Sequence, residues 1–195
     1  ATLSGDLVLI RVSGSVIDRV GGIASGMSGS PIYIDDKLLG AIGYGFAMSD
    51  HTIALVTPID DMMKVLERIP EEQRQKASSD EPNLVALGGE LGADLQFSAI
   101  AIAPDHETGL RWQEELGSDV AVALPVQTPL MVSGLGRRAV QRLDELLAEY
   151  NVVPIQAGGA PAHAGTATFE PGSALGVQLA RGDVSISSIG TVTYV

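Results

Sequence analysis

Ser28 is the residue of this chain best placed to do chemistry, because it lies in a run of small residues, Gly26-Met27-Ser28-Gly29-Ser30-Pro31. Such a run lets the backbone fold tightly enough for neighbouring N–H groups to point at one position. A serine hydroxyl beside converging N–H groups is the arrangement of a nucleophile with an oxyanion hole. The same residues also suit a plain Gly/Ser turn that ends at a proline. Both interpretations place Ser28 in a tight turn.

The residues around this turn extend the pattern. The stretch Gly21 to Tyr33, GGIASGMSGSPIY, followed by Gly40-Ala41-Ile42, resembles the signature of the stage IV sporulation protein B serine peptidases. Shorter islands of resemblance lie at Val56–Ile59, Leu130–Leu135 and Gly176–Asp183. The resemblance implies a chymotrypsin-like serine endopeptidase with a Ser/His/Asp triad and no metal or organic cofactor. It makes Ser28 the nucleophile, and the N–H groups of Gly26 and Ser28 the oxyanion donors.

Two members of the implied triad have no match in this sequence. The position of the acidic member corresponds to Ser13, and Asp18 is the nearest acidic residue before the motif. In the family, the histidine lies in a Gly-His dipeptide a few residues beyond a strand similar to Gly190–Val195, and this sequence ends at Val195. A serine without a histidine in reach is a weak nucleophile near neutral pH. We therefore expect the isolated chain to be inactive and to be a fragment or a processed piece.

Three histidines in the sequence are candidates to replace the missing base. His51 is expected at a solvated tip between two strands, His106 in a polar turn, and His163 in a loop rich in Gly, Ala and Pro. None of them resembles a family position. Their spacing does not match that of metal ligands, and the chain has no cysteine to complete a site. No metal site is predicted.

Composition limits the partners. The chain has 195 residues, of which 45% are hydrophobic and 4% aromatic, so aliphatic side chains must fill its core. The formal net charge of −12, from 24 acidic and 12 basic residues, argues against nucleic acid or an anionic membrane surface. No apolar run is long enough for a membrane helix. The expected partner is a protein or peptide substrate, which could be the chain itself.

The hydrophobic pattern predicts strands and a few helices. A hairpin is expected across Asp35-Asp36-Lys37, and one helix is expected from Pro58 to Ile69, with Thr57 as its cap. A second helix is expected over Gly134–Tyr150, capped by Ser133, with an apolar stripe that includes Leu143, Leu146 and Tyr150. Strands are expected at 6–12, 32–34, 38–44, 52–56, 84–87, 97–103, 110–113, 120–124, 130–133, 151–156, 166–169, 175–179, 184–188 and 191–195.

The predicted fold class is mainly β with two or more helices, α+β, built as an incomplete or rearranged chymotrypsin-like β-barrel with an accessory α/β lobe. The serine-bearing peptidase-like region would span 1–70, a linker 71–83, the accessory lobe 84–156, and a C-terminal β segment 157–195. That last segment is expected to pack with the first region. The residues from Pro125 to Pro129 suit either a substrate-facing loop or a simple connection.

Two functions fit these residues. The first is a serine endopeptidase-like domain that hydrolyses peptide bonds through Ser28, with self-processing as one form of it. The second is a non-catalytic, peptidase-like module that binds or scaffolds another protein. The family resemblance predicts a bacterial, exported protein, whose signal would lie before Ala1.

Overall fold

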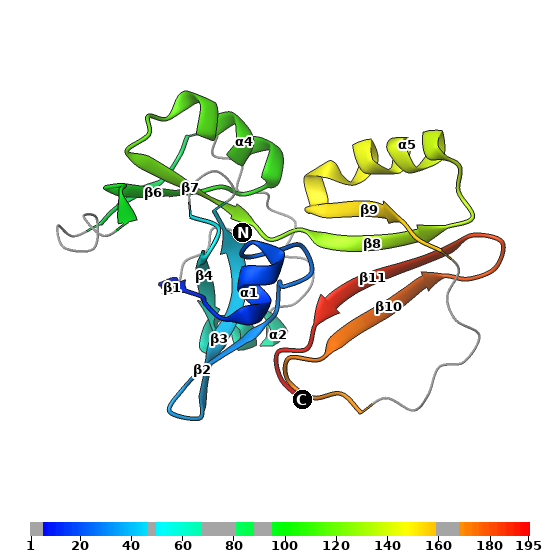
Figure 1. The fold of residues 1–195 in the computed structure, drawn as a ribbon, viewed down its shortest axis with the longest axis horizontal. Helices are drawn as coiled ribbons and strands as arrows, with labels where there is room; N and C mark the ends of the chain where they lie inside the picture. Colours follow the sequence, from blue (N-terminus) through cyan, green and yellow to red (C-terminus); the bar gives the residue numbers. More distant parts are fainter. Residues whose placement is uncertain (1–5, 47–49, 68–80, 88–94, 159–167) are drawn as a thin grey trace.

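A computed structural model describes residues 6–46, 50–67, 81–87, 95–158 and 168–195. Over these residues the chain is mainly β, with eleven strands and four α-helices, as the sequence predicts (Figure 1). Most of the predicted linker 71–83, the strand start at Thr166 and the histidine His163 lie outside the described residues.

The elements follow one another along the chain without long repeats. The strands are β1 (Val8–Arg11), β2 (Pro31–Ile34), β3 (Lys37–Gly45), β4 (Ile53–Pro58), β5 (Leu84–Ala86), β6 (Ala99–Ile102), β7 (Val120–Pro125), β8 (Thr128–Ser133), β9 (Val152–Gln156), β10 (Ala174–Ala180) and β11 (Ser185–Thr191). The helices are α1 (Ser15–Val20), α2 (Ile59–Glu67), α4 (His106–Glu115), α5 (Arg137–Leu147) and the 3₁₀ turn η2 (Ala148–Tyr150).

The first sheet has seven strands in the order β1-β4-β3-β7-β6-β5, with β2 paired to β3, and it curls like part of a barrel (Figure 1). The predicted hairpin is confirmed as β2 and β3, which join at Asp35 and Asp36. Both aspartates have positive φ, 48° and 60°. Two successive residues of this kind match the twist of the strands that they connect. The hairpin follows directly on the Ser28 turn.

Two strand–helix–strand units follow in series. Strands β6 and β7 are parallel and connected through α4, and strands β8 and β9 are parallel and connected through α5. Only Val126 and Gln127 separate β7 from β8, so the chain passes directly from the first sheet into the second. Figure 1 shows α4 over β6 and β7 and α5 over β8 and β9.

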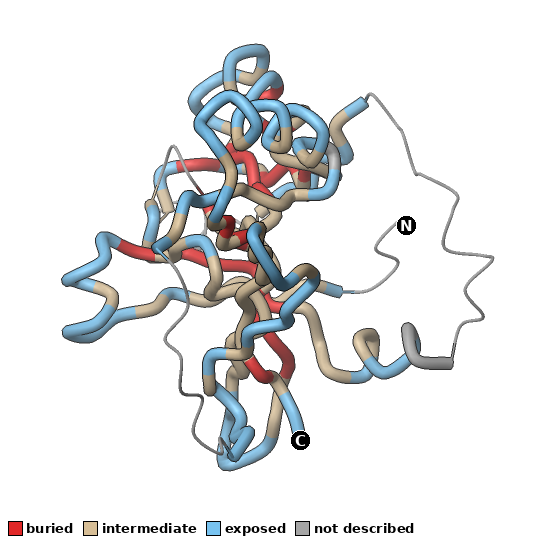
Figure 2. The backbone as a smooth tube through the Cα atoms, turned by 90° about the vertical axis from the view of Figure 1, so that its right-hand side faces the viewer, coloured by how far each residue is buried: buried red, intermediate tan, exposed pale blue. Residues whose placement is uncertain are grey.

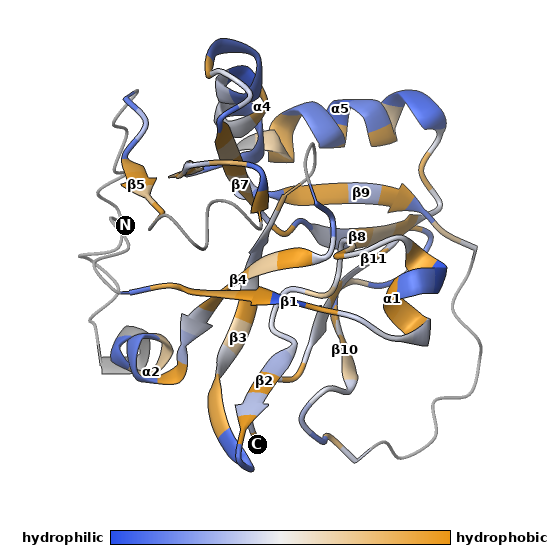
Figure 3. Ribbon diagram, turned by 60° about the vertical axis from the view of Figure 1, so that its left-hand side comes forward, coloured by the Kyte–Doolittle hydropathy of each residue, from blue (hydrophilic) through white to orange (hydrophobic). Residues whose placement is uncertain are grey.

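The second sheet has four strands in the order β10-β11-β8-β9. Helix α5 turns Val140, Leu143 and Leu147 toward it and keeps its charged residues outside, as Figure 3 shows by colour. The predicted stripe is wrong at Leu146 and Tyr150, which are exposed. The helix also begins later than predicted: Gly136 is its N-cap, and Ser133 ends β8. The pairing of β8 with β11 takes Ser133 into the sheet.

The buried residues of the first sheet form three clusters: one around Phe46 and Phe97, one around Trp112 of α4, and one around Ile42 and Val56. Figure 2 shows the buried residues concentrated along the central strands. The rings of Phe46 and Phe97 stack there, with their centroids 6.0 Å apart. Such a pair contributes about 0.5–1.5 kcal/mol beyond the area that it buries. Phe46 and Phe97 thus anchor a cluster whose other buried members are aliphatic.

Helix α4 corrects one prediction. The sequence predicts a strand at 110–113, where Leu110 and Trp112 alternate with polar residues, but these residues are helical. The carboxylate of Asp105 accepts a hydrogen bond from the N–H of Thr108 at 2.7 Å and caps the helix. Trp112 is buried against the sheet and Leu110 is exposed. The cap and the packing of Trp112 thus outweigh the local alternation.

Gly109 on α4 gives a test of this packing. A Cβ atom at this position would lie 1.9 Å from Cδ2 of Leu124 and 2.9 Å from Cβ of Ala103. We expect Gly109→Ala to lower the free energy of unfolding by about 1–3 kcal/mol, because the helix would have to move off the sheet. Chemical denaturation measures this change. The matched control is Gly117→Ala, where a Cβ meets nothing within 4 Å, and an equal loss in both variants would contradict this account of the packing.

Candidate active site

The Ser28 turn consists of two successive reverse turns. The N–H of Met27 donates to the carbonyl of Ala24 at 3.1 Å, and the N–H of Ser30 donates to the carbonyl of Met27 at 3.0 Å. Ser28 lies inside the second turn and is half-buried. Gly26 and Gly29 on either side have φ of +90° and +86°. Side chains larger than hydrogen strain such a backbone, so the small residues noted in the sequence are needed for this shape.

The turn is fixed to strand β3. The N–H of Gly29 donates to the carbonyl of Ile42 at 2.9 Å, and the N–H of Ile42 donates to the carbonyl of Ser30 at 3.0 Å. These bonds extend the β2–β3 pairing up to the turn. Ser28 therefore sits at the end of a sheet strand rather than on a free loop.

The last residues of the described chain lie against the same turn. The hydroxyl of Thr191 donates to the carbonyl of Gly26 at 2.9 Å, and the hydroxyl of Thr193 donates to the carbonyl of Gly29 at 2.6 Å. A Cβ atom at Gly29 would lie 2.6 Å from the carbonyl oxygen of Thr191. The C-terminal segment and the Ser28 turn therefore meet backbone to backbone, although more than 160 residues separate them.

The two predicted oxyanion donors differ in their hydrogen bonding. The N–H of Gly26 donates to the carbonyl of Gln127 at 3.0 Å. The N–H of Ser28 makes no hydrogen bond to any residue that the structure describes. One donor is thus available and the other is held by the connection between β7 and β8. No local signal in the sequence singles out Gln127 for this contact.

The described part of the chain provides no base or acid at the Ser28 hydroxyl. Within it, no side chain forms a hydrogen bond to that hydroxyl. Ser13 precedes α1, and Asp18 lies on α1 with its side chain exposed. The structure thus does not bring Asp18 to a histidine within the described residues. Helix α1 itself was not predicted.

The two described histidines lie elsewhere, and they share a small cavity. His51 lies in the turn before β4, and His106 is the first residue of α4 rather than part of an irregular turn. Together with Ser25 they line a cavity of about 160 Å³. The segment from Pro125 to Gln127 forms another wall. These residues come from four separate parts of the chain, so no sequence pattern predicts that they line one cavity.

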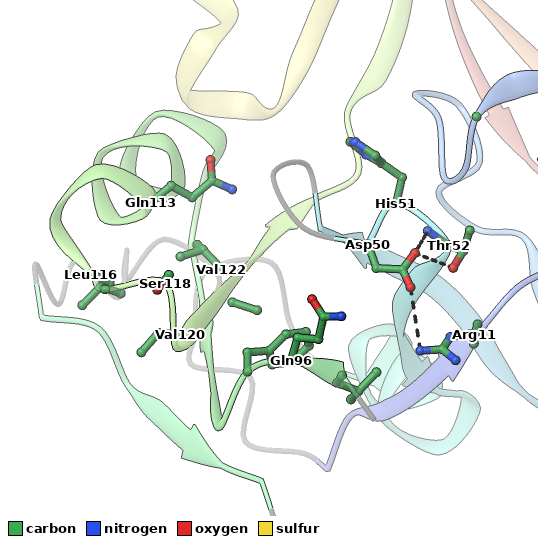
Figure 4. Close-up of a pocket in the computed structure, with 15 residues that line it drawn as sticks. Arg11, Asp50, His51, Thr52, Gln96, Gln113, Leu116, Ser118, Val120 and Val122 are labelled. Carbon is green, nitrogen blue, oxygen red and sulfur yellow. Dashed lines mark hydrogen bonds and ion pairs between the residues drawn. The ribbon is translucent and has the colours of Figure 1, made fainter. Parts of the chain in front are cut away.

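His51 also lines a larger cavity, of about 820 Å³. Figure 4 shows Arg11, Asp50 and Thr52 along one side and Gln113 on the opposite side. The carboxylate of Asp50 accepts hydrogen bonds from the hydroxyl of Thr52 at 2.5 Å and from its N–H at 2.9 Å. An ion pair with Arg11 at 3.7 Å is largely exposed and weak. The His51 ring points away from this carboxylate (Figure 4), so the two form no acid–base pair.

Neither cavity provides a set of metal ligands. In the ranges that the structure describes, no group of three or more His, Cys, Asp or Glu side chains converges. No helix in those ranges is long and apolar enough to cross a membrane. The chemistry available near Ser28 is therefore that of a hydroxyl, backbone N–H groups and the imidazoles of the small cavity.

Asp50 allows a test of the larger cavity. The Thr52 hydroxyl lowers the pKa of Asp50, with help from the Thr52 N–H and Arg11. The pKa of Asp50 is lower in the folded state than in the unfolded state, where it is about 3.9, so the ionised carboxylate stabilises the fold at pH values above about 3.9. This stabilisation is lost as the pH falls through the pKa of the folded state. We expect Thr52→Val to lower the unfolding temperature at pH 7. Below about pH 4 this decrease should become progressively smaller. Thermal unfolding across this range measures the difference, and a difference that does not change with pH would contradict the assignment.

Comparisons with known proteins bear on the segment that carries Ser28. No curated protein and no solved structure matches the chain. The family model described as SpoIVB peptidase S55 matches residues 3–63, which run from before β1 into α2 and include the whole Ser28 turn. This match confirms the family resemblance that the sequence motif predicts. Residues 3–63 are thus similar to the SpoIVB peptidase S55 family.

Proposed function

We propose that the chain is the nucleophile-bearing part of a serine endopeptidase of the SpoIVB type, with Ser28 as the nucleophile. The observation that carries the proposal is the Ser28 turn, which holds a half-buried serine between two glycines of positive φ inside the family-matched segment. The family implies a protein or peptide substrate. The proposal includes a chymotrypsin-like barrel as the fold of the complete peptidase and an exported location for the protein.

The hydrolysis would use few groups. The Ser28 Oγ attacks the carbonyl carbon of a peptide bond, a base takes the hydroxyl proton, and the carbonyl oxygen becomes an oxyanion. The N–H groups of Gly26 and Ser28 donate to that oxyanion. The base then gives its proton to the leaving amine, and water releases the acyl group from Ser28. Self-cleavage would follow the same steps.

The base in this proposal comes from a Gly-His dipeptide beyond Val195, as in the family. The contact of Thr193 with Gly29 supports this, since it brings the chain to the Ser28 turn two residues before Val195. Each further residue adds at most about 3.6 Å of reach. A histidine a few residues later could therefore approach Ser28 from the side of the C-terminal segment.

The isolated chain is proposed to be inactive. Gln127 holds the N–H of Gly26, and the described residues place no base beside Ser28. These two observations also support the second function, a non-catalytic module that keeps the peptidase turn for its shape and binds another protein. The two functions differ in whether Ser28 is chemically reactive when the chain is complete.

Labelling with a serine-reactive fluorophosphonate separates them. We expect an adduct on Ser28, located by mass spectrometry, in a form extended past Val195 through the Gly-His dipeptide. Labelling of the present chain should be slower by about 10²–10⁴-fold, which is the contribution of a general base. Ser28→Ala should abolish the adduct. Ser30→Ala is the matched control from the same turn and should keep the adduct, and absence of a Ser28 adduct from both forms would leave only the binding module.

The contact with Thr193 can be tested in the extended form. Thr193→Val removes the hydrogen bond to the Gly29 carbonyl, which stabilises the contact by about 1 kcal/mol. We expect the labelling rate of Ser28 to fall roughly fivefold, because the base would be positioned less firmly. Thr128→Val is the control, since the Thr128 hydroxyl makes no hydrogen bond within the described residues. Equal rates in the two variants would argue against delivery of the base by this segment.

A further inference from the structure

The small cavity beside the Ser28 turn has a composition that selects a ligand. Its polar lining consists of Ser25, His51, His106 and Gln127, and no aspartate or glutamate that the structure describes lines it. Phe46 and Leu124 contribute apolar walls. A histidine donates at least one N–H in either protonation state, and a serine hydroxyl can donate too. The cavity therefore offers several donors to an acceptor group.

The cavity lies within reach of Ser28. Ser25 precedes Ser28 by three residues, so their Cα atoms are at most roughly 11 Å apart. The reverse turn from Ala24 to Met27 shortens that path. Gln127, another lining residue, accepts the Gly26 N–H. A peptide whose carbonyl lies at Ser28 can therefore place a neighbouring side chain in this cavity.

The size suits one side chain. About 160 Å³ is below the 300–1,000 Å³ typical of sites for whole small molecules, and each water in liquid takes about 30 Å³. A carboxylate with a short aliphatic stem fills such a space, with its stem against Phe46 and Leu124. Hydrogen bonds to an ionised acceptor are roughly twice as strong as those to a neutral one. The donors thus favour a carboxylate over an amide of the same shape.

Two acidic residues adjoin the lining histidines in sequence, and each has hydrogen-bond partners of its own. The Asp50 carboxylate, adjacent to His51 in sequence, accepts from Thr52 and pairs with Arg11. The Asp105 carboxylate, adjacent to His106, accepts from the N–H of Thr108. Neither lines the cavity. Within the described residues, no hydrogen bond or ion pair joins the imidazole of His51 or His106 to either of these carboxylates.

We propose that this cavity binds an acidic side chain, that of glutamate or aspartate, of a peptide positioned at Ser28. The inference rests on the proposed function for the place of the peptide, and it adds the selectivity of the site. Self-processing or cleavage of another protein would then be directed to a bond near an acidic residue.

Binding to a chain that cannot react tests this inference. The protein is the full 195-residue chain with Ser28→Ala, and the probes are the capped peptides Ac-Ala-Glu-Ala-NH₂ and Ac-Ala-Gln-Ala-NH₂. Titrations followed by the imidazole NMR signals of His51 and His106 give the two affinities. We expect the glutamate peptide to bind about tenfold more tightly than the glutamine peptide, which corresponds to about 1.4 kcal/mol.

Variants at both histidines complete the test. His51→Gln and His106→Gln should each reduce the preference severalfold, and titrations of these variants are followed by backbone amide signals. If one of these variants does not fold, the peptide preference of the other variant is the test. Leu110→Gln, at an exposed position on α4, is the matched control and should keep the preference. Equal affinities for the two peptides, no binding of either, or an undiminished preference in the histidine variants would overturn the inference.

This outcome is independent of the labelling of Ser28. A glutamate preference without a Ser28 adduct in the extended form would reject the peptidase and leave a module that binds acidic peptides. A Ser28 adduct without a glutamate preference would reject only the selectivity proposed here.

Discussion

The hydrogen bond from the Gly26 N–H to the Gln127 carbonyl is the interaction on which the site depends. Gln127 lies between β7 and β8, where the chain leaves the first sheet for the second. The neighbouring N–H of Val126 donates to the carbonyl of Gly43 on β3, so this connection is itself fixed to the sheet that carries the turn. The shape of the Ser28 turn is therefore coupled to the junction of the two sheets. A shift of that junction would change the position of the Gly26 N–H.

The C-terminal strands fix the turn from its other side. Strand β11 pairs with β8, and the residues after it reach Gly29 through Thr193. The turn is thus held between β3, the β7–β8 connection and the C-terminal segment. The three contacts use mostly backbone groups, which change little when side chains vary. A turn held in this way is preorganised, whether it serves to stabilise an oxyanion or to bind a partner.

The sequence predicted the features that depend on local chemistry. The β2–β3 hairpin, the Ser28 turn and the central part of α5 follow from turn residues and apolar spacing. It missed α1, which is short and has no buried residue, and it made α4 a strand because Leu110 and Trp112 alternate with polar residues. It could not predict the contacts of the turn with distant residues: the Gly26 N–H donates to the Gln127 carbonyl, and the Thr193 hydroxyl donates to the Gly29 carbonyl. Each of these bonds has a backbone carbonyl as its acceptor, and backbone groups are the same in every residue type, so no sequence pattern marks the pairs.

The occupied Gly26 N–H is compatible with catalysis in the proposed peptidase, on energetic grounds. A neutral hydrogen bond such as that to Gln127 contributes about 0.5–1.5 kcal/mol net, so releasing it is a small step. The carbonyl oxygen of a bound substrate is also neutral and would gain little by displacing Gln127. The oxyanion of the transition state forms a charge-assisted bond roughly twice as strong, and it would displace Gln127 readily. The exchange would then favour the transition state over the bound substrate, which is the condition for accelerating the chemical step.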